Sequence, residues 1–347
     1  KRKKTTKSTT TSNKQQILWS KESLEKLPNL GSRFDEKKVG YALQIASDIH
    51  LEFYGWEKTD WGSQFCNNWQ QECAKLSHHD SVIKSLNYNT PAQLVAEFEE
   101  ILTIPRDQPL DLALLGDIGL PLHENQALFY AHFLKWTTNH WQNVFFLLGN
   151  HEFYAKNSDL TVSHCIELGK AIEETLNARK KGTVYFINTS RVDLEKVSII
   201  GATLWTNIPQ EHYEPIWFRM NDYRCIVVSD SSNEKGIRGA EPKDTNAWHH
   251  AQVEYIANQA KAVEKERGLD IPVIVLTHHS PLPRADSTKY MGNPVTFACA
   301  TDLRKYFEDP IRVWAYGHTH VVFEEREKAT LVVSNARGYL HDRVNNY

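Results

Sequence analysis

The chain has 347 residues, and its 40 Lys and Arg against 43 Asp and Glu give a net charge of −3 at pH 7. Hydrophobic residues make up 41% of the sequence and aromatic residues 11%. This is the composition of an ordinary globular protein, and it excludes a collagen-like chain, an acidic disordered chain and a small disulfide-stapled protein. The length suits one large domain or two modest ones.

Positive charge is concentrated at the start of the chain. Residues 1–16 hold six Lys and Arg and no acidic or large apolar residue. We therefore expect 1–39 to be a basic polar segment, mostly disordered at its start, followed by one domain over 40–347. The segment is either a nuclear-localisation or nucleic-acid-binding arm or a solvated leader without function. Without those six residues, 34 basic residues face 43 acidic ones, and a body with a net charge near −9 lacks the basic surface of a nucleic-acid-binding domain.

The five cysteines are scattered, and none forms a C-x-x-C pair. An odd, scattered set predicts reduced thiols and an intracellular protein, in the cytoplasm or the nucleus. No apolar run reaches the ~18–20 residues that cross a bilayer, and no secretory signal pattern opens the chain. We therefore expect no membrane partner.

Short apolar runs rich in β-branched and aromatic residues alternate with longer segments of helical periodicity. The apolar runs predict strands over 43–46, 112–115, 144–148, 184–187, 197–201, 273–276, 313–316 and 331–333. The periodic segments predict helices over 91–102, 123–138, 159–179, 244–267 and 301–307. Thr90 before Pro91, Asp159 and Asp244 are the expected helix starts. This alternation predicts an α/β protein.

The stretch 55–109 separates the first two predicted strands and has no strand pattern of its own. It contains a helical piece and three tryptophans, Trp56, Trp61 and Trp69. We interpret it as an insertion. Its tryptophans form either an aromatic wall for a nucleobase or part of a buried core.

Polar residues that bind metals follow five of the predicted strands. In chain order they are Asp48 and His50, Asp117, Asn150 and His151, His278 and His279, and His318 and His320. Ligands bind at the carboxyl edge of the strands in α/β sheets, so we expect these side chains to converge. Each cluster alone is a weak signal, but five clusters in this order are a strong one.

The residue types indicate the kind of cation. Carboxylate and imidazole together suit Zn, Mn, Fe or Ni, whereas a calcium site takes oxygen ligands only. In an extended segment, Asp48 and His50 lie on one face, as do His318 and His320. A carboxylate such as Asp117 can bridge two cations ~3.5–4 Å apart.

The order Asp-x-His, Gly-Asp, Gly-Asn-His-Glu, His and Gly-His-x-His resembles the signature of the calcineurin-like metallophosphoesterase superfamily. The resemblance runs from about Leu43 to Tyr339 and includes pieces similar to a branch of small predicted phosphohydrolases. It implies a four-layer α/β fold, in which a two-sheet β-sandwich is flanked by helices. It also implies two divalent or trivalent metal ions, Mn, Fe or Zn, at one sheet edge.

Carried over residue by residue, the resemblance implies a complete ligand set. The first metal would be held by Asp48, His50 and His320, the second by Asn150, His278 and His318, and Asp117 would bridge them. His151 would be catalytic, as a phosphate contact or as the general acid for the leaving oxygen. His279 is an alternative ligand to His278; otherwise it is a pocket residue. The 69 residues between Asp48 and Asp117 exceed the spacing expected for this branch.

Substrate contacts are expected outside the ligand set. Arg337 follows the last strand, and its guanidinium matches a phosphate; the alternative is a surface ion pair. Asn221 and Tyr223 either line the pocket or belong to a capped loop, and the same alternatives hold for Asp222 between them. His279 completes this group of candidates.

The function implied is hydrolysis of a phosphodiester or phosphomonoester by direct attack of a metal-bridging hydroxide. The expected substrate is a small phosphoester or nucleotide, because the acidic body disfavours a long nucleic acid. One alternative is a non-catalytic scaffold of the same fold that binds protein partners. Another is a nuclease that uses the basic N-terminal segment. The sequence does not predict the oligomeric state.

Overall fold

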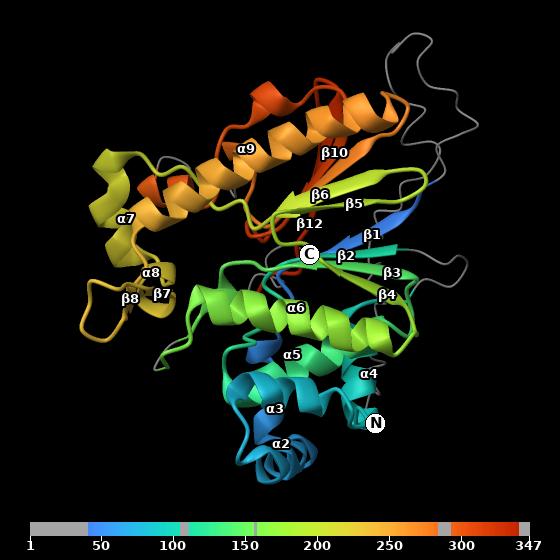
Figure 1. The fold of residues 1–347 in the computed structure, drawn as a ribbon, viewed down its shortest axis with the longest axis vertical. Helices are drawn as coiled ribbons and strands as arrows, with labels where there is room; N and C mark the ends of the chain where they lie inside the picture. The colour runs from blue at the N-terminus through green and yellow to red at the C-terminus, as the bar shows by residue number, and fades with distance from the viewer. Residues whose placement is uncertain (1–40, 105–110, 156–157, 284–292, 340–347) are drawn as a thin grey trace, which may run out of the picture.

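The structure is a computed structural model, and it describes residues 41–104, 111–155, 158–283 and 293–339. The predicted segment 1–39 lies outside these ranges, as do residues 105–109 of the predicted insertion. In the described residues, two sheets pack face to face between two layers of helices (Figure 1). The predicted four-layer α/β sandwich is therefore confirmed.

The first sheet consists of four described strands, all parallel, in the order β1-β2-β3-β4. They are β1 (Leu43–Ala46), β2 (Asp111–Leu115), β3 (Asn143–Leu147) and β4 (Thr183–Phe186). In β2, Leu112 and Leu114 pack toward the helices, while Ala113 and Leu115 face the second sheet. Both faces of the strand are buried, which is why its sequence is one unbroken apolar run.

The second sheet has six described strands in the order β11-β12-β10-β9-β6-β5. They are β5 (Ser190–Asp193), β6 (Ser198–Ala202), β9 (Val273–Thr277), β10 (Ile311–Tyr316), β11 (Val322–Glu327) and β12 (Thr330–Asn335). The four inner strands are parallel, and the edge strands β5 and β11 are antiparallel to their neighbours. In β9, Ile274 and Leu276 face the first sheet, and Val273 and Val275 face a helix.

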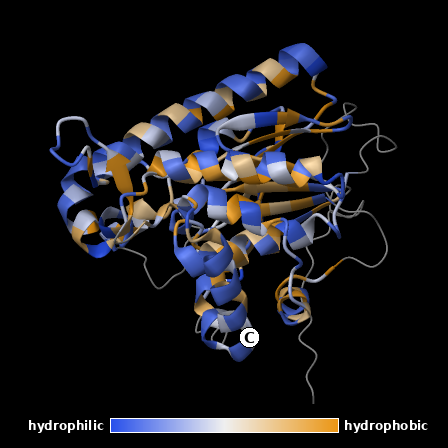
Figure 2. Cartoon of the chain, turned by 60° about the horizontal axis from the view of Figure 1, so that its bottom comes forward, coloured by the Kyte–Doolittle hydropathy of each residue, from blue (hydrophilic) through white to orange (hydrophobic). Residues whose placement is uncertain are grey.

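Helices cover the outer face of each sheet (Figure 1). α9 (Pro242–Arg267) lies over the six-stranded sheet, and α4 (Ala92–Ile101), α5 (Glu124–Thr137) and α6 (Val162–Ala178) lie under the four-stranded sheet. α2 (Asp60–Cys73) and α3 (His78–Ser85) lie outside them. Figure 2 shows the apolar strands enclosed by helices whose outer faces are mainly hydrophilic. None of the helices in the described ranges is both long and apolar enough to cross a membrane.

A small projection precedes α9 at the left of Figure 1. It contains α7 (Tyr213–Arg219), α8 (Asp222–Cys225), β7 (Val227–Ser229) and β8 (Ile237–Gly239).

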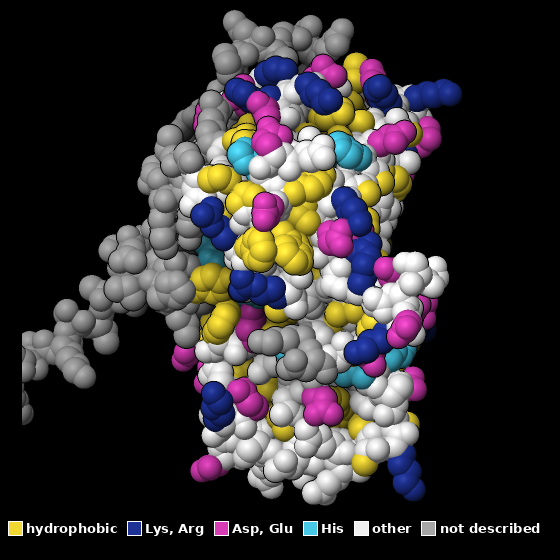
Figure 3. Space-filling view, turned by 90° about the vertical axis from the view of Figure 1, so that its left-hand side faces the viewer, with side chains coloured by type: hydrophobic (Ala, Val, Ile, Leu, Met, Phe, Trp, Pro, Cys, Tyr) yellow, Lys and Arg dark blue, Asp and Glu magenta, His cyan; other side chains and the backbone are white. Residues whose placement is uncertain are grey.

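Short 3-10 turns occur along the whole described chain: η1 (Leu51–Phe53), η2 (Trp56–Lys58), η3 (His151–Phe153), η4 (Gln210–His212), η7 (Pro294–Ala298) and η8 (Arg304–Tyr306). On the side of the molecule where the projection lies, exposed apolar residues gather among charged ones (Figure 3). Trp217, Phe218 and Phe297 are 40–56% exposed.

All eight predicted strands are present with small shifts at their ends, but the helix predicted over 301–307 is wrong. Leu303 and Phe307 have non-helical backbone angles on the two sides of Arg304–Tyr306, and the N–H groups of Thr301 and Leu303 donate to the carbonyls of Ser280 and Pro281, which holds the segment against the chain after β9. Only the 3-10 turn η8 forms there.

The helix starts also differ from the prediction. The α6 N-cap is Thr161, not Asp159. α9 begins at Pro242, directly after its N-cap Glu241, whose N–H donates to the carboxylate of Asp244 in the first turn. Thr90 does not cap α4; its hydroxyl instead bonds the Nδ1 of His132 at 2.9 Å.

The described part of the stretch 55–109 forms three helices, two more than the sequence pattern predicts. They cover the outer face of α5, which is buried continuously from Ala127 to Thr137. Trp56 lies 5.4 Å from Phe129 and 5.7 Å from Phe98, between ring centroids, and the Trp69 indole N–H donates to the Ser81 carbonyl. For Trp56 and Trp69, the buried-core interpretation is therefore confirmed.

Candidate metal centre

The seven predicted ligands lie at the carboxyl ends of five parallel strands. Asp48 and His50 follow β1, Asp117 follows β2, Asn150 follows β3, His278 follows β9, and His318 and His320 follow β10. Among the described residues, three overlapping groups have ligand atoms within 4.8 Å of one another. They are Asp48, His50 and His320; His50, Asp117 and His151; and Asp117, His278 and His318.

The loops that carry these residues have an unusual backbone. Five of the predicted ligands have positive φ angles, between 52° and 66°; they are Asp48, His50, Asp117, His318 and His320. Non-glycine residues reach this region at a cost of ~1–3 kcal/mol each, and such residues concentrate at functional sites. Backbone hydrogen bonds hold the loops together: Asp48 N donates to the Gly116 carbonyl at 3.0 Å, and His50 N to the Asp117 carbonyl at 2.9 Å.

Two glycines allow the loops to approach this closely. Gly116 has a φ of 84°, and a Cβ there would lie 2.4 Å from the backbone nitrogen of Gly149. A Cβ on Gly149 would lie 2.2 Å from Asp117 Oδ1. A side chain at Gly116 would displace the backbone at Gly149 or the His278 ring, and one at Gly149 would displace the carboxylate predicted to bridge the metals.

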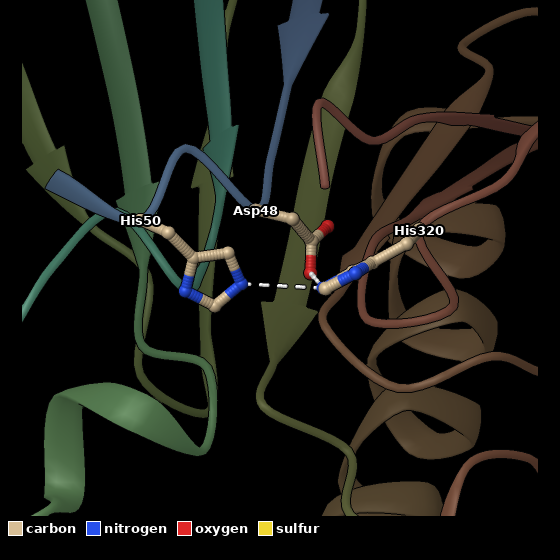
Figure 4. Close-up of side chains that lie close together, drawn as sticks. All are labelled: Asp48, His50 and His320. Atoms are coloured by element: carbon tan, nitrogen blue, oxygen red, sulfur yellow. Dashed lines mark hydrogen bonds and ion pairs between the residues drawn. The ribbon is translucent and has the colours of Figure 1, made fainter. Parts of the chain in front are cut away.

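The first group consists of Asp48, His50 and His320 (Figure 4). The two histidines point their Nε2 atoms toward each other at 3.2 Å, and His320 Nε2 lies 3.4 Å from Asp48 Oδ1. Asp48 is fully buried, and both its oxygens accept from the His318 N–H at 3.0 Å. Burial raises the pKa of Asp48, but His320 and His278 lower it below its usual range.

The second group is centred on His278 Nε2. Asn150 Oδ1 lies 3.0 Å from it and His318 Nδ1 3.1 Å from it. The other ring nitrogen of His278 lies 2.8 Å from the Leu115 carbonyl, which only an N–H can satisfy. That contact leaves the Nε2 lone pair directed into the group, as a metal ligand requires.

Asp117 joins the two groups. Its Oδ1 lies 3.4 Å from His278 Nε2, and its Oδ2 lies 3.9 Å from the Nε2 atoms of both His50 and His151. Burial raises the pKa of Asp117, but His278, His151 and His50 together hold it well below its usual range. One oxygen therefore faces each group.

The geometry and the donor types fit metal ions. Metal–nitrogen bonds of ~2.0–2.1 Å in a tetrahedral site place neighbouring ligand atoms ~3.3 Å apart. The facing nitrogens in the two groups are 3.1–3.2 Å apart. Carboxylate, imidazole and amide oxygen are also the mixture that transition metals take.

His151 lies on η3 beside the bridging carboxylate. Its backbone N–H donates to Asp117 Oδ1 at 2.9 Å, and its Nδ1 bonds Glu52 Oε1 at 3.1 Å. The Tyr339 hydroxyl lies 3.4 Å from its Nε2. Burial lowers the pKa of His151, but Asp117 and Glu52 raise it to about 9. Both carboxylates thus favour the positively charged form of the ring.

Glu52 is a site residue that the sequence analysis missed. Its Oε1 accepts from the Nδ1 of His50 at 2.9 Å and the Nδ1 of His151 at 3.1 Å. Burial raises the pKa of Glu52, but its bonds to His151 and His50 lower it to about 2. One carboxylate thus sets the tautomer of both rings. The alternation Asp48-x-His50-x-Glu52 is the signal that could have revealed it.

Glu152 holds the base of the centre. It accepts backbone N–H groups from Gly149 at 2.7 Å, Ile118 at 2.7 Å and Asp117 at 2.9 Å. Burial and the nearby Asp117 raise the pKa of Glu152 to about 8. The fourth residue of Gly-Asn-His-Glu therefore fixes the loops that carry the ligands.

The four predicted substrate contacts lie around the centre rather than within it. His279 is buried, its ring is 4.3 Å from that of His318, and its Nδ1 bonds the Thr203 carbonyl at 3.2 Å. Burial, reinforced by His278, lowers the pKa of His279 to about 3. The ligand-atom groups contain His278 and not His279.

The other three candidates occupy different environments. Asn221 is exposed at the start of α8, whereas Tyr223 is buried with its hydroxyl 3.1 Å from the Thr245 hydroxyl. Arg337 is half-buried, and its guanidinium donates to the Ile101 carbonyl at the end of α4. The substrate roles of all four remain predictions.

A family model described as calcineurin-like phosphoesterase matches residues 45–322. The chain belongs to the calcineurin-like phosphoesterase family. The predicted resemblance is thereby confirmed. As a member of this family, the chain is a metal-dependent phosphoester hydrolase.

One protein sequence and one solved structure are similar to this calcineurin-like phosphoesterase. The chain is 30% identical over 250 residues to the uncharacterised protein L509 of Acanthamoeba polyphaga mimivirus, covering 67% of this chain and 80% of the relative. It also resembles the crystal structure of phosphopantetheinyl hydrolase from Mycobacterium tuberculosis, with a TM-score of 0.54. That match has 13% identity and covers 88% of this chain and 92% of the other, so it supports the fold alone.

Proposed function

We propose that this chain hydrolyses a small phosphoester with two metal ions held side by side at the strand ends. Asp48, His50 and His320 hold the first ion, Asn150, His278 and His318 hold the second, and Asp117 bridges them. The observation that carries the proposal is the position of Asp117, whose two oxygens face the two groups separately. This is the arrangement of a carboxylate shared between two cations.

Two bound cations would lower the pKa of a water between them and neutralise charge on the phosphoryl oxygens. The proposed ligand set leaves the two ions with a net positive charge. Asp48 and Asp117 are the only carboxylates among the seven proposed ligands, so they offset only half the charge of two divalent ions. The neutral ligands preserve an attraction for an anionic ester.

His151 is the proposed general acid. It lies beside Asp117, and Glu52 holds its Nδ1 so that its Nε2 faces the centre. Its proton would go to the leaving oxygen as the ester bond breaks, a contribution worth ~10²–10⁴ in rate. Once that proton has been transferred, Glu52 keeps the neutral ring in the same tautomer.

The electrostatics support a small substrate. The body of the chain outside residues 1–16 has an excess of acidic residues, and binding of a long nucleic acid depends on many basic contacts to phosphate. A small phosphodiester or a nucleotide needs only the metal ions and a few neighbouring groups. The complete ligand set and the presence of His151 weigh against a non-catalytic scaffold.

Hydrolysis of an aryl phosphodiester and an aryl phosphomonoester, measured side by side, tests this proposal. Metal-stripped protein should be inactive, Mn²⁺-loaded protein should turn over at least one ester, and Asp117→Asn should remove that activity. Asp302→Asn, at an exposed ion pair with Arg304, is the matched control and should behave as wild type. Equal turnover by stripped and loaded protein, or by Asp117→Asn, would refute the proposal.

A further inference from the structure

Asn150 is the one proposed ligand that would bind its metal through an amide. The oxygen of an amide binds a cation, whereas its NH₂ group has no free lone pair to donate. Rotation of the Asn150 amide by 180° exchanges its oxygen and its NH₂ group with little change in the shape of the side chain. A reliable ligand at this position therefore needs neighbours that determine the orientation of the amide.

Two buried side chains provide such neighbours. Asn150 Nδ2 donates to Asp222 Oδ1 at 2.8 Å and to the Tyr154 hydroxyl at 3.1 Å. The Tyr154 hydroxyl donates in turn to the same Asp222 oxygen at 2.6 Å. Asn150 and Asp222 are each 3% exposed and Tyr154 is 8% exposed, so water does not compete freely for these bonds.

We propose that Asp222 and Tyr154 are positioning residues that hold the Asn150 oxygen toward the second metal. This rests on the proposed function, which makes Asn150 a ligand. The physical reason is that this Asp222 oxygen acts as an acceptor, since it takes hydrogen bonds from both the Tyr154 hydroxyl and the Asn150 NH₂ group. A flipped amide would place its oxygen 2.8 Å from the Asp222 oxygen, with no hydrogen between them, while its NH₂ group faced the metal. Asp222 therefore selects the one orientation that can bind.

Backbone contacts fix α8, which carries Asp222, relative to the loop that carries Asn150. Asp222 comes 72 residues after Asn150, on α8 of the projection. Ala155 N donates to the Cys225 carbonyl at 2.8 Å, and Tyr154 and Ile226 form an antiparallel bridge. The loop after β3 and the end of α8 are thus joined by backbone as well as by side chains. Metal-ligand neighbours of this kind typically change metal affinity by 10–100-fold when they are removed.

Mn²⁺ titration of the full chain, followed by the EPR signal of free Mn²⁺, measures this effect without any substrate. Wild type should show two binding steps. In Asp222→Ala, one of the two steps, that of the metal held by Asn150, should weaken by ~10–100-fold while the other stays within about threefold. Tyr213→Phe is the matched control, because it removes a hydroxyl from α7 of the same projection that accepts from Asn246 instead of Asn150. It should leave both steps unchanged.

Exchanging the two side chains gives a stricter test. Asn150→Asp alone places two carboxylates against each other and should weaken binding of the second metal. Adding Asp222→Asn restores one donor and one acceptor, so the double variant should recover at least tenfold of the lost affinity. This variant keeps every polar group buried at the site, so it tests the inference even if Asp222→Ala does not fold, as judged by circular dichroism.

The possible outcomes separate this inference from the proposed function. Second-site affinity in folded Asp222→Ala equal to that of wild type, or no recovery in the double variant, would overturn the positioning role. Two metals bound by wild type without turnover of either ester would count against the proposed function alone. Loss of the second metal in Tyr213→Phe would show a general effect of disturbing the projection and would also overturn the positioning role.

Discussion

The metal centre and the helical region α2–α5 are built from opposite kinds of buried residue. The centre buries carboxylates and histidines side by side and holds five non-glycine residues at positive φ. The helical region buries aromatic rings in contact with one another: Phe98 packs 5.1 Å from Phe133 and 5.7 Å from Trp136 and Trp56, between ring centroids. One region supplies the chemistry and the other supplies stability.

The difference shows how the fold tolerates a strained site. Backbone strain and buried polar groups each cost ~1–3 kcal/mol, and a centre with several of them does not stabilise itself. The apolar layers on both sides of the first sheet hold the strands, and the strands hold the loops. We therefore expect substitutions in the centre to change activity more than stability, and substitutions in the helical region to do the reverse.

Asp117→Asn should have the largest effect. Loss of the bridging charge should remove several kcal/mol of transition-state stabilisation, which lowers turnover by at least ~10³-fold. The far-UV circular dichroism spectrum should stay that of wild type, because the scaffold does not depend on this side chain. Activity assays with Mn²⁺ and a spectrum of the same sample check both parts. An unfolded variant would contradict the division between the two regions.

His151→Ala should lower kcat by ~10²–10⁴-fold and leave two metals bound per chain, because the ring donates a proton rather than holding a cation. Metal analysis of the dialysed protein, together with steady-state kinetics, separates these roles. Loss of one metal would make His151 a ligand.

Phe98→Ala should show the opposite behaviour. The ring is fully buried in the helical region, and its removal should cost ~3–5 kcal/mol in the free energy of unfolding. Below the unfolding transition, metal content and kcat should stay within about threefold of wild type. Urea unfolding of this variant and of Phe218→Ala, whose ring is 56% exposed, provides the comparison; the exposed site should change stability by less than ~0.5 kcal/mol.

His132 should make the helical region sensitive to acid, with the smallest of the four effects. Burial, with a contribution from Lys135, lowers the pKa of His132 to about 3. The unfolded chain takes up this proton near pH 6.5, so the stabilisation is complete above pH 6.5 and is lost as the pH falls toward 3. Between pH 7 and pH 5 the loss should be about 2 kcal/mol.

Urea unfolding of metal-free wild type and His132→Gln at pH 7 and pH 5 checks this prediction. Glutamine offers a donor and an acceptor to Thr90 and Ser85, which bond the histidine ring, but it does not titrate. The variant should therefore lose about 2 kcal/mol less than wild type on acidification. An identical pH dependence in both proteins would assign the acid sensitivity to other groups.

The sequence predicted the strands that are buried on both faces, because their apolar runs are continuous. It did not predict β5 and β11, which lie at the sheet edges; the sequence of β11 is Val-Phe-Glu-Glu-Arg-Glu and contains four charges. It also missed α2, where polar residues hide the periodicity on the outside of the molecule. Elements with an open face carry a weaker pattern.

For the candidate metal centre, too, the sequence predicted the residues that carry a local pattern. The ligands could be predicted because each follows a strand within a short motif. Asp222 was a candidate for the pocket, but its contact with the Asn150 amide could not be predicted, because 72 residues separate the two and no local pattern connects them. Glu52 lies only two residues from His50, but its second bond, to His151, spans 99 residues. Short-range motifs indicate ligands, whereas their orientation depends on contacts that only the fold creates.

The central claim is that Asp117 holds two metals at the shared edge of five strands. EPR spectroscopy of protein loaded with two equivalents of Mn²⁺ tests it most directly. Two ions bridged by one carboxylate should give a spin-coupled spectrum in wild type, and Asp117→Asn should give only the signals of isolated or free Mn²⁺. An uncoupled spectrum from fully loaded wild type, or a stoichiometry of one, would contradict the claim.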